Sequence, residues 1–322
     1  MFVPCVRPGK SSGAACARVH KDGRVKSGWL ARDAVLEAMR APAVQDACTA
    51  AQAQIDALLQ TPPLRRPGST TASAVAALRE YAGHGSAALM GADLSISTFR
   101  AVRGDGSPLA AAVAVAESLL LAAVRDAHTF TVSPLRALAA WHVLATSHGS
   151  SDSETRGRPR LTGAEVRADP LNTGIAPVEV AVLVQHVVAL TSADALPTTP
   201  AVAIAAAVHG LIAAGQPFAE ANAVIARTAA RAILVARGAD PDGLTPFEAA
   251  IAAAGRPAYV NHLRALAQVG SAEAADASAA TDAWVGWLVW HCGTIAVAAD
   301  RAARELTEGA AASSGTRDAN RN

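Results

Sequence analysis

Apolar residues recur every three or four positions along most of the chain after Trp29. Pro, Gly and Ser interrupt this pattern repeatedly. Such spacing is typical of helices that bury one face against their neighbours. The expected helices cover residues 44–59, 72–81, 109–124, 135–146, 177–190, 201–214, 228–235, 257–269 and 281–306, and the predicted fold class is therefore all-α.

Glycine and proline mark the expected ends of these helices. Gly83-His84-Gly85 is expected to stop the helix over residues 72–81. Ser133-Pro134 offers an N-cap followed by proline at the first helical position. The longest stretch without helical spacing, 148–170, is rich in Ser, Gly, Pro and Arg, and a short β-hairpin could form there.

The chain divides by composition into two tails and one helical domain. Residues 1–28 carry six basic side chains against one acid and are interpreted as a disordered, solvated tail rather than a nucleic-acid-binding arm. Residues 309–322 are expected to form a second disordered tail. The domain between the tails comprises N-terminal helices (29–150), an irregular segment (151–175) and C-terminal helices (176–308).

Composition indicates closely packed helices and gives no sign of a nucleic-acid-binding, membrane-surface or disulfide-bonded protein. Apolar residues make up 51% of the chain and aromatic residues only 4%, so the helices are expected to be Ala-rich and closely packed. The formal net charge of +1 gives no general attraction to nucleic acid or to a membrane surface. The four cysteines lie far apart without a C-x-x-C pair, which indicates neither a disulfide framework nor a zinc ribbon and fits a reduced cytosol.

The apolar runs are too short to predict a membrane span. A span needs about 20 predominantly apolar residues, and the closest run, Leu109–Val124, is interrupted by Glu117. The first residues also lack the apolar segment of a signal peptide. We therefore expect a cytoplasmic protein with no membrane partner and no nucleic-acid partner, and a homo-oligomer remains an open alternative.

The most informative run is Gln216–Arg227, which reads Gln-Pro-Phe-Ala-Glu-Ala-Asn-Ala-Val-Ile-Ala-Arg. It separates two apolar helical segments. Its turn, its acid, its small-Asn-small triplet and its Arg form a layout in which backbone N–H groups and a helix N-terminus can face an anion. The run predicts two helices between residues 200 and 237, broken at Gln216–Ala223, with Phe218 buried as the anchor of the loop.

This order of residues resembles the core motif of the Fic (Fido) family, H-P-F-x-[D/E]-G-N-G-R-x-x-R. Members of that family typically move AMP from ATP to a hydroxyl group on a target protein. The similarity extends over about residues 45 to 305 and is closest to an Ala-rich branch found in high-GC actinobacteria. The resemblance implies a Mg²⁺ ligand at Glu220. It implies nucleotide-binding positions at Pro217, Phe218, Ala221, Asn222, Ala223 and Arg227.

The chain departs from the family motif where the chemistry takes place. Gln216 stands at the position of the general base, and an amide has no basicity near neutral pH, which forfeits a rate factor of about 10² to 10⁴. Ala221 and Ala223 replace two glycines, and each costs on the order of 1 kcal/mol if its backbone needs a positive φ. Val224 replaces a phosphate-clamping Arg, a loss of about 1.5–3 kcal/mol.

Two further stretches resemble family elements. Many Fic proteins carry an inhibitory [S/T]-x-x-x-E-G motif whose Glu pairs with the second motif Arg, here Arg227. Ser86, Met90 and Gly91 have that layout with Met in place of Glu, and a thioether cannot pair with a guanidinium. Gly157, Arg158 and Arg160 resemble the entry to the flap hairpin that holds a target segment, so residues 157–168 are expected to lie beside the motif loop.

Other candidate sites have simpler structural explanations. His209 precedes Gln216 by about two helical turns, roughly 10 Å, and is interpreted as a buried helix histidine bonded to a neighbour rather than as a substitute base. Trp284, Trp287 and Trp290 are interpreted as a stripe that packs on the motif helices.

Three functions remain open at this point. The first is a degenerate Fic-like protein, inactive or very weakly active, that binds a nucleotide, a target segment or a partner protein. The second is an active protein adenylyltransferase that uses an unusual base, with ATP and Mg²⁺ as cofactors. The third is a pure protein-interaction module.

Overall fold

A computed structural model describes residues 32–65, 68–147, 154–161, 166, 180–192, 196–268 and 277–319. The predicted tail over residues 1–28 lies outside this range. The helices are α1 (Arg32–Arg40), α2 (Pro42–Leu59), α3 (Pro62–Arg65), α4 (Ser69–Leu89), α5 (Ile96–Ala101), α6 (Pro108–Arg125), α7 (Ala127–Val132), α8 (Pro134–Ala145), α9 (Val180–Thr191), α10 (Ala201–Gly215), α11 (Asn222–Ala236), α12 (Phe247–Ala254), α13 (Arg256–Gln268) and α14 (Ala277–Ala319). The described residues contain no strand, which confirms the all-α prediction.

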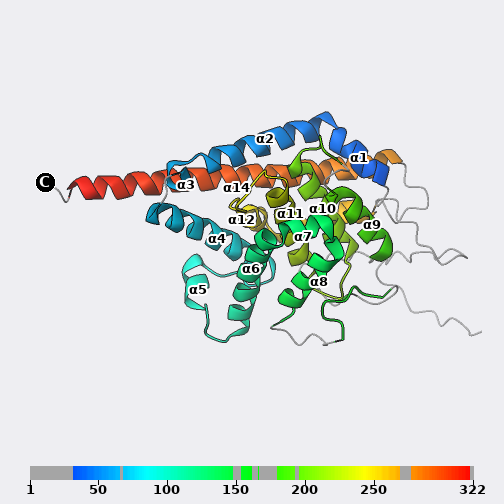
Figure 1. The fold of residues 1–322 in the computed structure, drawn as a ribbon, viewed down its shortest axis with the longest axis horizontal. Coiled ribbons are helices and arrows are strands. Elements are labelled where there is room, and N and C mark those ends of the chain that lie inside the picture. The colour runs from blue at the N-terminus through cyan, green and yellow to red at the C-terminus, as the bar shows by residue number, and fades with distance from the viewer. Residues whose placement is uncertain are drawn as a thin grey trace, which may run out of the picture.

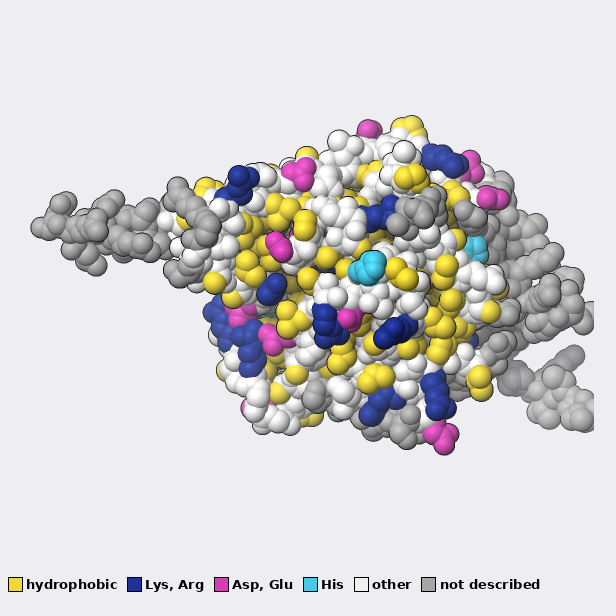
Figure 2. Space-filling model, viewed as in Figure 1, with side chains coloured by type: hydrophobic (Ala, Val, Ile, Leu, Met, Phe, Trp, Pro, Cys, Tyr) yellow, Lys and Arg dark blue, Asp and Glu magenta, His cyan; other side chains and the backbone are white. Residues whose placement is uncertain are grey.

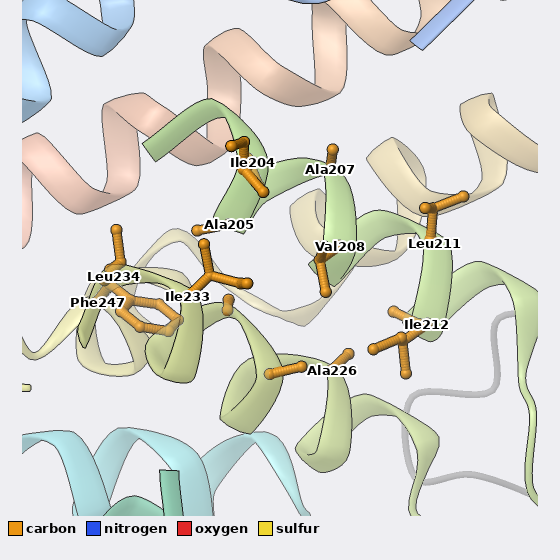
Figure 3. Close-up of a cluster of buried hydrophobic side chains, with 14 of the residues drawn as sticks. Ile204, Ala205, Ala207, Val208, Leu211, Ile212, Ala226, Ile233, Leu234 and Phe247 are labelled. Carbon is orange, nitrogen blue, oxygen red and sulfur yellow. The ribbon is translucent and has the colours of Figure 1, made fainter. Parts of the chain in front are cut away.

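The helices α10 and α11 form the centre of the molecule (Figure 1). Helix α10 packs against α9, α11, α13 and α14, and every residue from Val202 to Gly215 is buried. A helix that is apolar on all sides is stable in water only when other elements surround it. Figure 3 shows Val208 and Ile212 of α10 with Ala226 and Ile233 of α11 filling the space between the two helices.

Tryptophans of α14 hold the last helix against the centre. Trp284 and Trp287 are fully buried, and Trp287 Nε1 donates a hydrogen bond to the Ala206 carbonyl of α10 over 2.7 Å. A Cβ at Gly210 would lie 2.7 Å from the same indole nitrogen, so only glycine allows this approach. The predicted packing of the Trp stripe is thus confirmed for two of its members.

The long helices α2 and α14 lie side by side along one edge of the molecule (Figure 1). Their contact buries Cys48 and Cys292, whose Sγ atoms are 3.6 Å apart and which are both free thiols. Helix α14 continues to Ala319, through residues that composition assigned to a disordered tail. The alanines from Ala310 to Ala312 favour helix and explain the difference.

Glycines in α4 have a different role from the one the sequence predicts. The helix does not stop at Gly83 and Gly85 but runs through both to Leu89. A Cβ at Gly85 would lie 2.4 Å from backbone atoms of Ala249 in α12, so α4 and α12 touch through their backbones. The glycines permit close packing, and the packing outweighs their low helix propensity.

By length and composition, α6 is the one described helix that is apolar enough to cross a membrane, although Glu117 lies within it. The same acid is the reason why the sequence predicts no membrane span there. In the structure α6 packs against α4, α8 and α11, and Ala116, Leu119 and Ala123 are buried. The helix therefore forms part of the core.

Candidate functional site

The loop from Gln216 to Ala221 joins α10 to α11 at the centre of the fold. Helix α10 ends at Gly215 and α11 begins at Asn222, so the predicted break between two helices is confirmed. Phe218 is fully buried, as expected of an anchor. The loop turns through two left-handed residues, Gln216 at φ 51° and Ala221 at φ 60°.

Asn222 holds this loop closed. Its Oδ1 accepts a hydrogen bond from the Phe218 amide and its Nδ2 donates one to the Phe218 carbonyl, both over 2.9 Å. The side chain is fully buried. The amide predicted to contact a nucleotide is thus already engaged in shaping the loop.

The first turn of α11 has a positive electrostatic potential that favours a bound anion. No side chain caps it among the described residues, because its N-cap position is Ala221. The first N–H groups of a helix have no partner within the helix, and the helix dipole adds positive potential there. A helix of 15 residues therefore begins with donors that suit a phosphate.

The two alanines that replace family glycines differ in conformation. Ala221 has a positive φ and carries the strain expected of a non-glycine residue there. Ala223 lies inside α11 and does not have a positive φ. The expected cost therefore applies to Ala221 alone.

Arg227 is buried beside the predicted inhibitory motif. Its side chain is 1% exposed, and its Nη2 lies 3.3 Å from both the carbonyl oxygen and the Oγ of Ser86. Its Nε and Nη1 have no hydrogen-bond partner among the described residues. Met90, the C-cap of α4, and Gly91 follow one turn after Ser86. The structure brings the two motifs together, and none of the acids that it describes pairs with Arg227.

Arg231, one turn later in α11, is fully paired. It bonds both carboxylate oxygens of Glu248 and the carbonyl oxygens of Gly243 and Thr245. Its guanidinium carbon also lies 5.0 Å from the centroid of the Phe247 ring. The family resemblance gives Arg227 and Arg231 as the R-x-x-x-R start of the second motif helix. In the structure Arg231 joins α11 to the start of α12.

The flap contacts the motif loop through Arg160. Its backbone amide donates to the Pro217 carbonyl over 2.9 Å, and its Nε donates to the Gln216 carbonyl over 2.6 Å. Its Nη2 lies 3.4 Å from the Gly215 carbonyl at the end of α10. Residues 154–161 form turns and irregular chain without a strand. The rest of the predicted hairpin, apart from residue 166, lies outside the described residues. Arg158 is exposed.

His142 of α8 is a site residue that the sequence analysis missed. Its ring stacks on Phe218 with centroids 4.3 Å apart. The Gly157 amide donates to its Nδ1 over 2.9 Å, which places the proton of the neutral ring on Nε2, and that atom has no partner among the described residues. Burial lowers the pKa of His142 to about 4, and the nearby Glu220 opposes this shift.

His209 is a buried histidine bonded to its neighbours, as predicted. Its Nδ1 lies 2.7 Å from His291 Nε2 and its Nε2 lies 2.6 Å from the Tyr259 hydroxyl. Burial, His291 and Arg227 together lower the pKa of His209 well below its usual value. Burial lowers the pKa of His291 to about 3. Both rings are neutral at physiological pH and support α10 from within.

Glu220 is half-buried at the start of α11. The described residues contain no cluster of three or more His, Cys, Asp or Glu side chains that could hold a metal ion. A single carboxylate can therefore hold Mg²⁺ only when the phosphates of a bound ligand supply further oxygen atoms.

Comparison with solved structures shows which fold this is. The chain superposes on a Fic family protein from Desulfovibrio desulfuricans G20 with a TM-score of 0.56, at 19% identity, over 82% of this chain and 75% of that one. It superposes on Fic-1 from C. elegans with a TM-score of 0.55, at 15% identity, over 84% and 73%. No protein-family model and no curated sequence matches the chain. The chain has the fold of the Fic family proteins.

Proposed function

We propose that this chain is a Fic-like protein that binds a nucleotide through its phosphates and does not transfer AMP. The observation that carries this proposal is the buried guanidinium of Arg227, with two nitrogen atoms that have no hydrogen-bond partner within the described part of the chain. An unpaired buried charge is costly, and a native structure retains one where a ligand or ion completes it.

The position of Arg227 supports a phosphate as that ligand. It lies on the same helix as the uncapped first turn at Asn222, so helix dipole and guanidinium attract the same anion. Because Arg227 is only 1% exposed, an anion that reaches it displaces neighbouring side chains. Ser86 of α4 and the Arg160 segment are the contacts that such a ligand would rearrange.

A nucleotide with Mg²⁺ fits this arrangement in part. Glu220 would hold the ion together with the phosphates, and Arg227 would bind a terminal phosphate. The ion would neutralise phosphate charge. Val224 supplies no second cation, so we expect weaker binding than the complete family motif would give.

The absence of transfer follows from the available bases. Gln216 is an amide and stays neutral. The imidazole that contacts the loop, His142, has a pKa of about 4 and uses its Nδ1 to accept from Gly157. Neither group has the basicity to take a proton from a hydroxyl near pH 7.

The closed loop also favours a second candidate, a protein-interaction module without a ligand. Arg160 binds the loop through three donors, and Phe218, Asn222 and Arg227 are all buried. In that case the motif serves only to hold α10 and α11 together.

Calorimetric titration with Mg-ATP, Mg-ADP and inorganic phosphate tests the proposal. We expect binding of the nucleotides, weakened about 10- to 100-fold by Arg227→Met because a charged hydrogen bond is lost. Arg304→Met is the matched control, since it removes the same charge from a side chain that is 67% exposed. No binding of any of the three ligands would favour the interaction module.

A labelling experiment separates binding from catalysis. Protein incubated with Mg-ATP labelled at the α-phosphate should incorporate no label into itself. Incorporation that disappears in Glu220→Ala would contradict the proposal and show an active adenylyltransferase.

A further inference from the structure

A groove of about 510 Å³ lies between α4, α12 and α14, apart from the motif loop. Leu78 and Tyr81 of α4 form one wall, Ala249 and Ala253 of α12 form the floor, and α14 forms the other wall from Trp290 onward. On the face shown in Figure 2, hydrophobic side chains gather between α14 and α4. The volume lies within the range of about 300–1,000 Å³ that is typical of small-ligand sites.

The groove is open because the side chains along it are small. Four alanines of α12, two alanines of α14 and Gly293 contribute to its lining. A Cβ added at Gly293 would meet no atom within 4 Å. The backbone contact between Gly85 and Ala249 fixes the spacing of α4 and α12, so the floor cannot rise to close the hollow. The groove is therefore a preformed feature of the fold.

The charge of the groove restricts what can occupy it. Arg301 and Glu305 are the only charged side chains in its lining, and they bond each other over 2.7 Å. Arg301 also lies 5.7 Å from the centroid of the Tyr81 ring. Thr294 also lines the groove, and its hydroxyl donates to the His291 carbonyl of the same helix over 2.7 Å. An occupant meets no uncompensated charge, so a charged ligand would lose its hydration without gaining a partner.

We propose that this groove binds a small, uncharged aromatic molecule of two to three rings. Trp290, whose ring stacks on Tyr259 and His262, and Tyr81 line the groove, and such aromatic clusters favour a further aromatic ring in edge-to-face or offset contact. The alanines accept a flat body. This proposal does not depend on nucleotide binding at the motif loop.

The neutral fluorescent probe N-phenyl-1-naphthylamine tests the site. We expect saturable binding of one molecule per chain, with energy transfer from tryptophan. Gly293→Leu places a side chain in the open space of the groove and should weaken binding at least tenfold. The same change replaces a glycine inside a helix, so the variant should be more stable than the parent protein rather than unfolded.

Gly286→Leu is the matched control. Gly286 lies in the same helix, is exposed, has open space around it and does not line the groove. It should gain similar stability and bind the probe as the parent protein does. Equal binding by both leucine variants, or no saturable binding by the parent protein, would overturn the proposal.

Sedimentation velocity tests whether a second copy of the chain, rather than a small molecule, occupies the groove. A dimer that Gly293→Leu dissociates and Gly286→Leu preserves would show that the groove contacts a second copy of the chain, and would overturn the assignment to a small molecule.

Discussion

Arg227 and Arg231 are one turn apart on α11 and equally buried, yet their surroundings are opposite. Arg231 bonds a carboxylate and two carbonyl groups, whereas Arg227, among the residues that the structure describes, bonds Ser86 alone, over 3.3 Å. Arginine thus has a structural role at one position of the helix and lies in a candidate binding site at the other. Burial alone does not distinguish the two roles, whereas the number of hydrogen-bond partners does.

The difference extends to the chain around each arginine. Beyond Arg231, the Asp240 carboxylate accepts from the Leu244 and Thr245 amides and fixes the turn that leads to α12. Near Arg227, the first turn of α11 is uncapped and preceded by the strained Ala221. The arginine in the second half of α11 is therefore fully paired, whereas the arginine in the first half has unmet bonding capacity.

The largest effect is expected at the satisfied arginine. Arg231→Met leaves Glu248 buried without a partner and should lower the free energy of unfolding by about 3–5 kcal/mol. Chemical denaturation measures this loss, and Arg304→Met should change stability by less than about 0.5 kcal/mol. A loss below 1 kcal/mol, about the size of one neutral hydrogen bond, would contradict the structural role of Arg231.

Met90→Glu should supply the partner that Arg227 lacks. Residue 90 follows Ser86 by one turn of α4, and a carboxylate there should stabilise the protein by about 1.5–3 kcal/mol and weaken ATP binding. The gain should vanish in the Arg227→Met background. If the double variant keeps the gain, the two residues do not interact.

Arg227→Met should behave unlike its neighbour. Removal of an unpaired buried cation should leave the free energy of unfolding unchanged or raise it by about 1–3 kcal/mol. Thermal denaturation with and without Mg-ATP measures this, and the stabilisation by ATP should disappear. A destabilisation similar to that of Arg231→Met would remove the contrast between the two positions.

Two alanine replacements test the loop at the start of the helix. Ala221→Gly should stabilise the protein by about 1 kcal/mol because it relieves a positive φ. Ala223→Gly, two residues later but inside α11, should destabilise it by about 0.5–1 kcal/mol. Paired denaturation curves should show opposite signs, and equal signs would mean that the two backbone conformations do not differ.

The smallest effect concerns the contribution of Arg227 to the pH dependence of stability. His142, His209 and His291 have lowered pKa values, so the unfolded chain binds protons below its usual histidine pKa of about 6.5 while the folded chain does not. Stability should be complete above that pH and decline toward pH 4. Arg227→Met removes a cation beside His209, raises its pKa and should make this decline slightly shallower.

The sequence was sufficient to predict the two helices and the loop that make up the candidate site. The Gln216–Arg227 run between two apolar segments predicted the break between α10 and α11. The resemblance of Ser86–Gly91 to the inhibitory motif implied a position near Arg227, and in the structure Ser86 contacts Arg227. His209 was correctly expected to be buried. The local sequence pattern, or the order of residues in the family motif, was enough to predict each of these features.

What the sequence did not predict depends on contacts between distant segments. His142 reaches Phe218 from α8, and Glu248 reaches Arg231 from α12, with no pattern near either residue to signal it. Gly85 reads as a helix breaker until the backbone of α12 is known to touch it. The groove beside α14 is likewise defined by side chains that are small, and their sequence pattern resembles that of any Ala-rich helix.

The pairing of α2 with α14 has a consequence for how the chain folds. More than 200 residues separate the two helices, and each is the most extensive neighbour of the other. A ribosome adds about 5–20 residues per second, so the apolar face of α2 with Val44, Cys48 and Ile55 waits roughly 10–40 s for its cover. Helix α2 is therefore synthesised among the first helices, but its main packing contact forms among the last, after synthesis of α14.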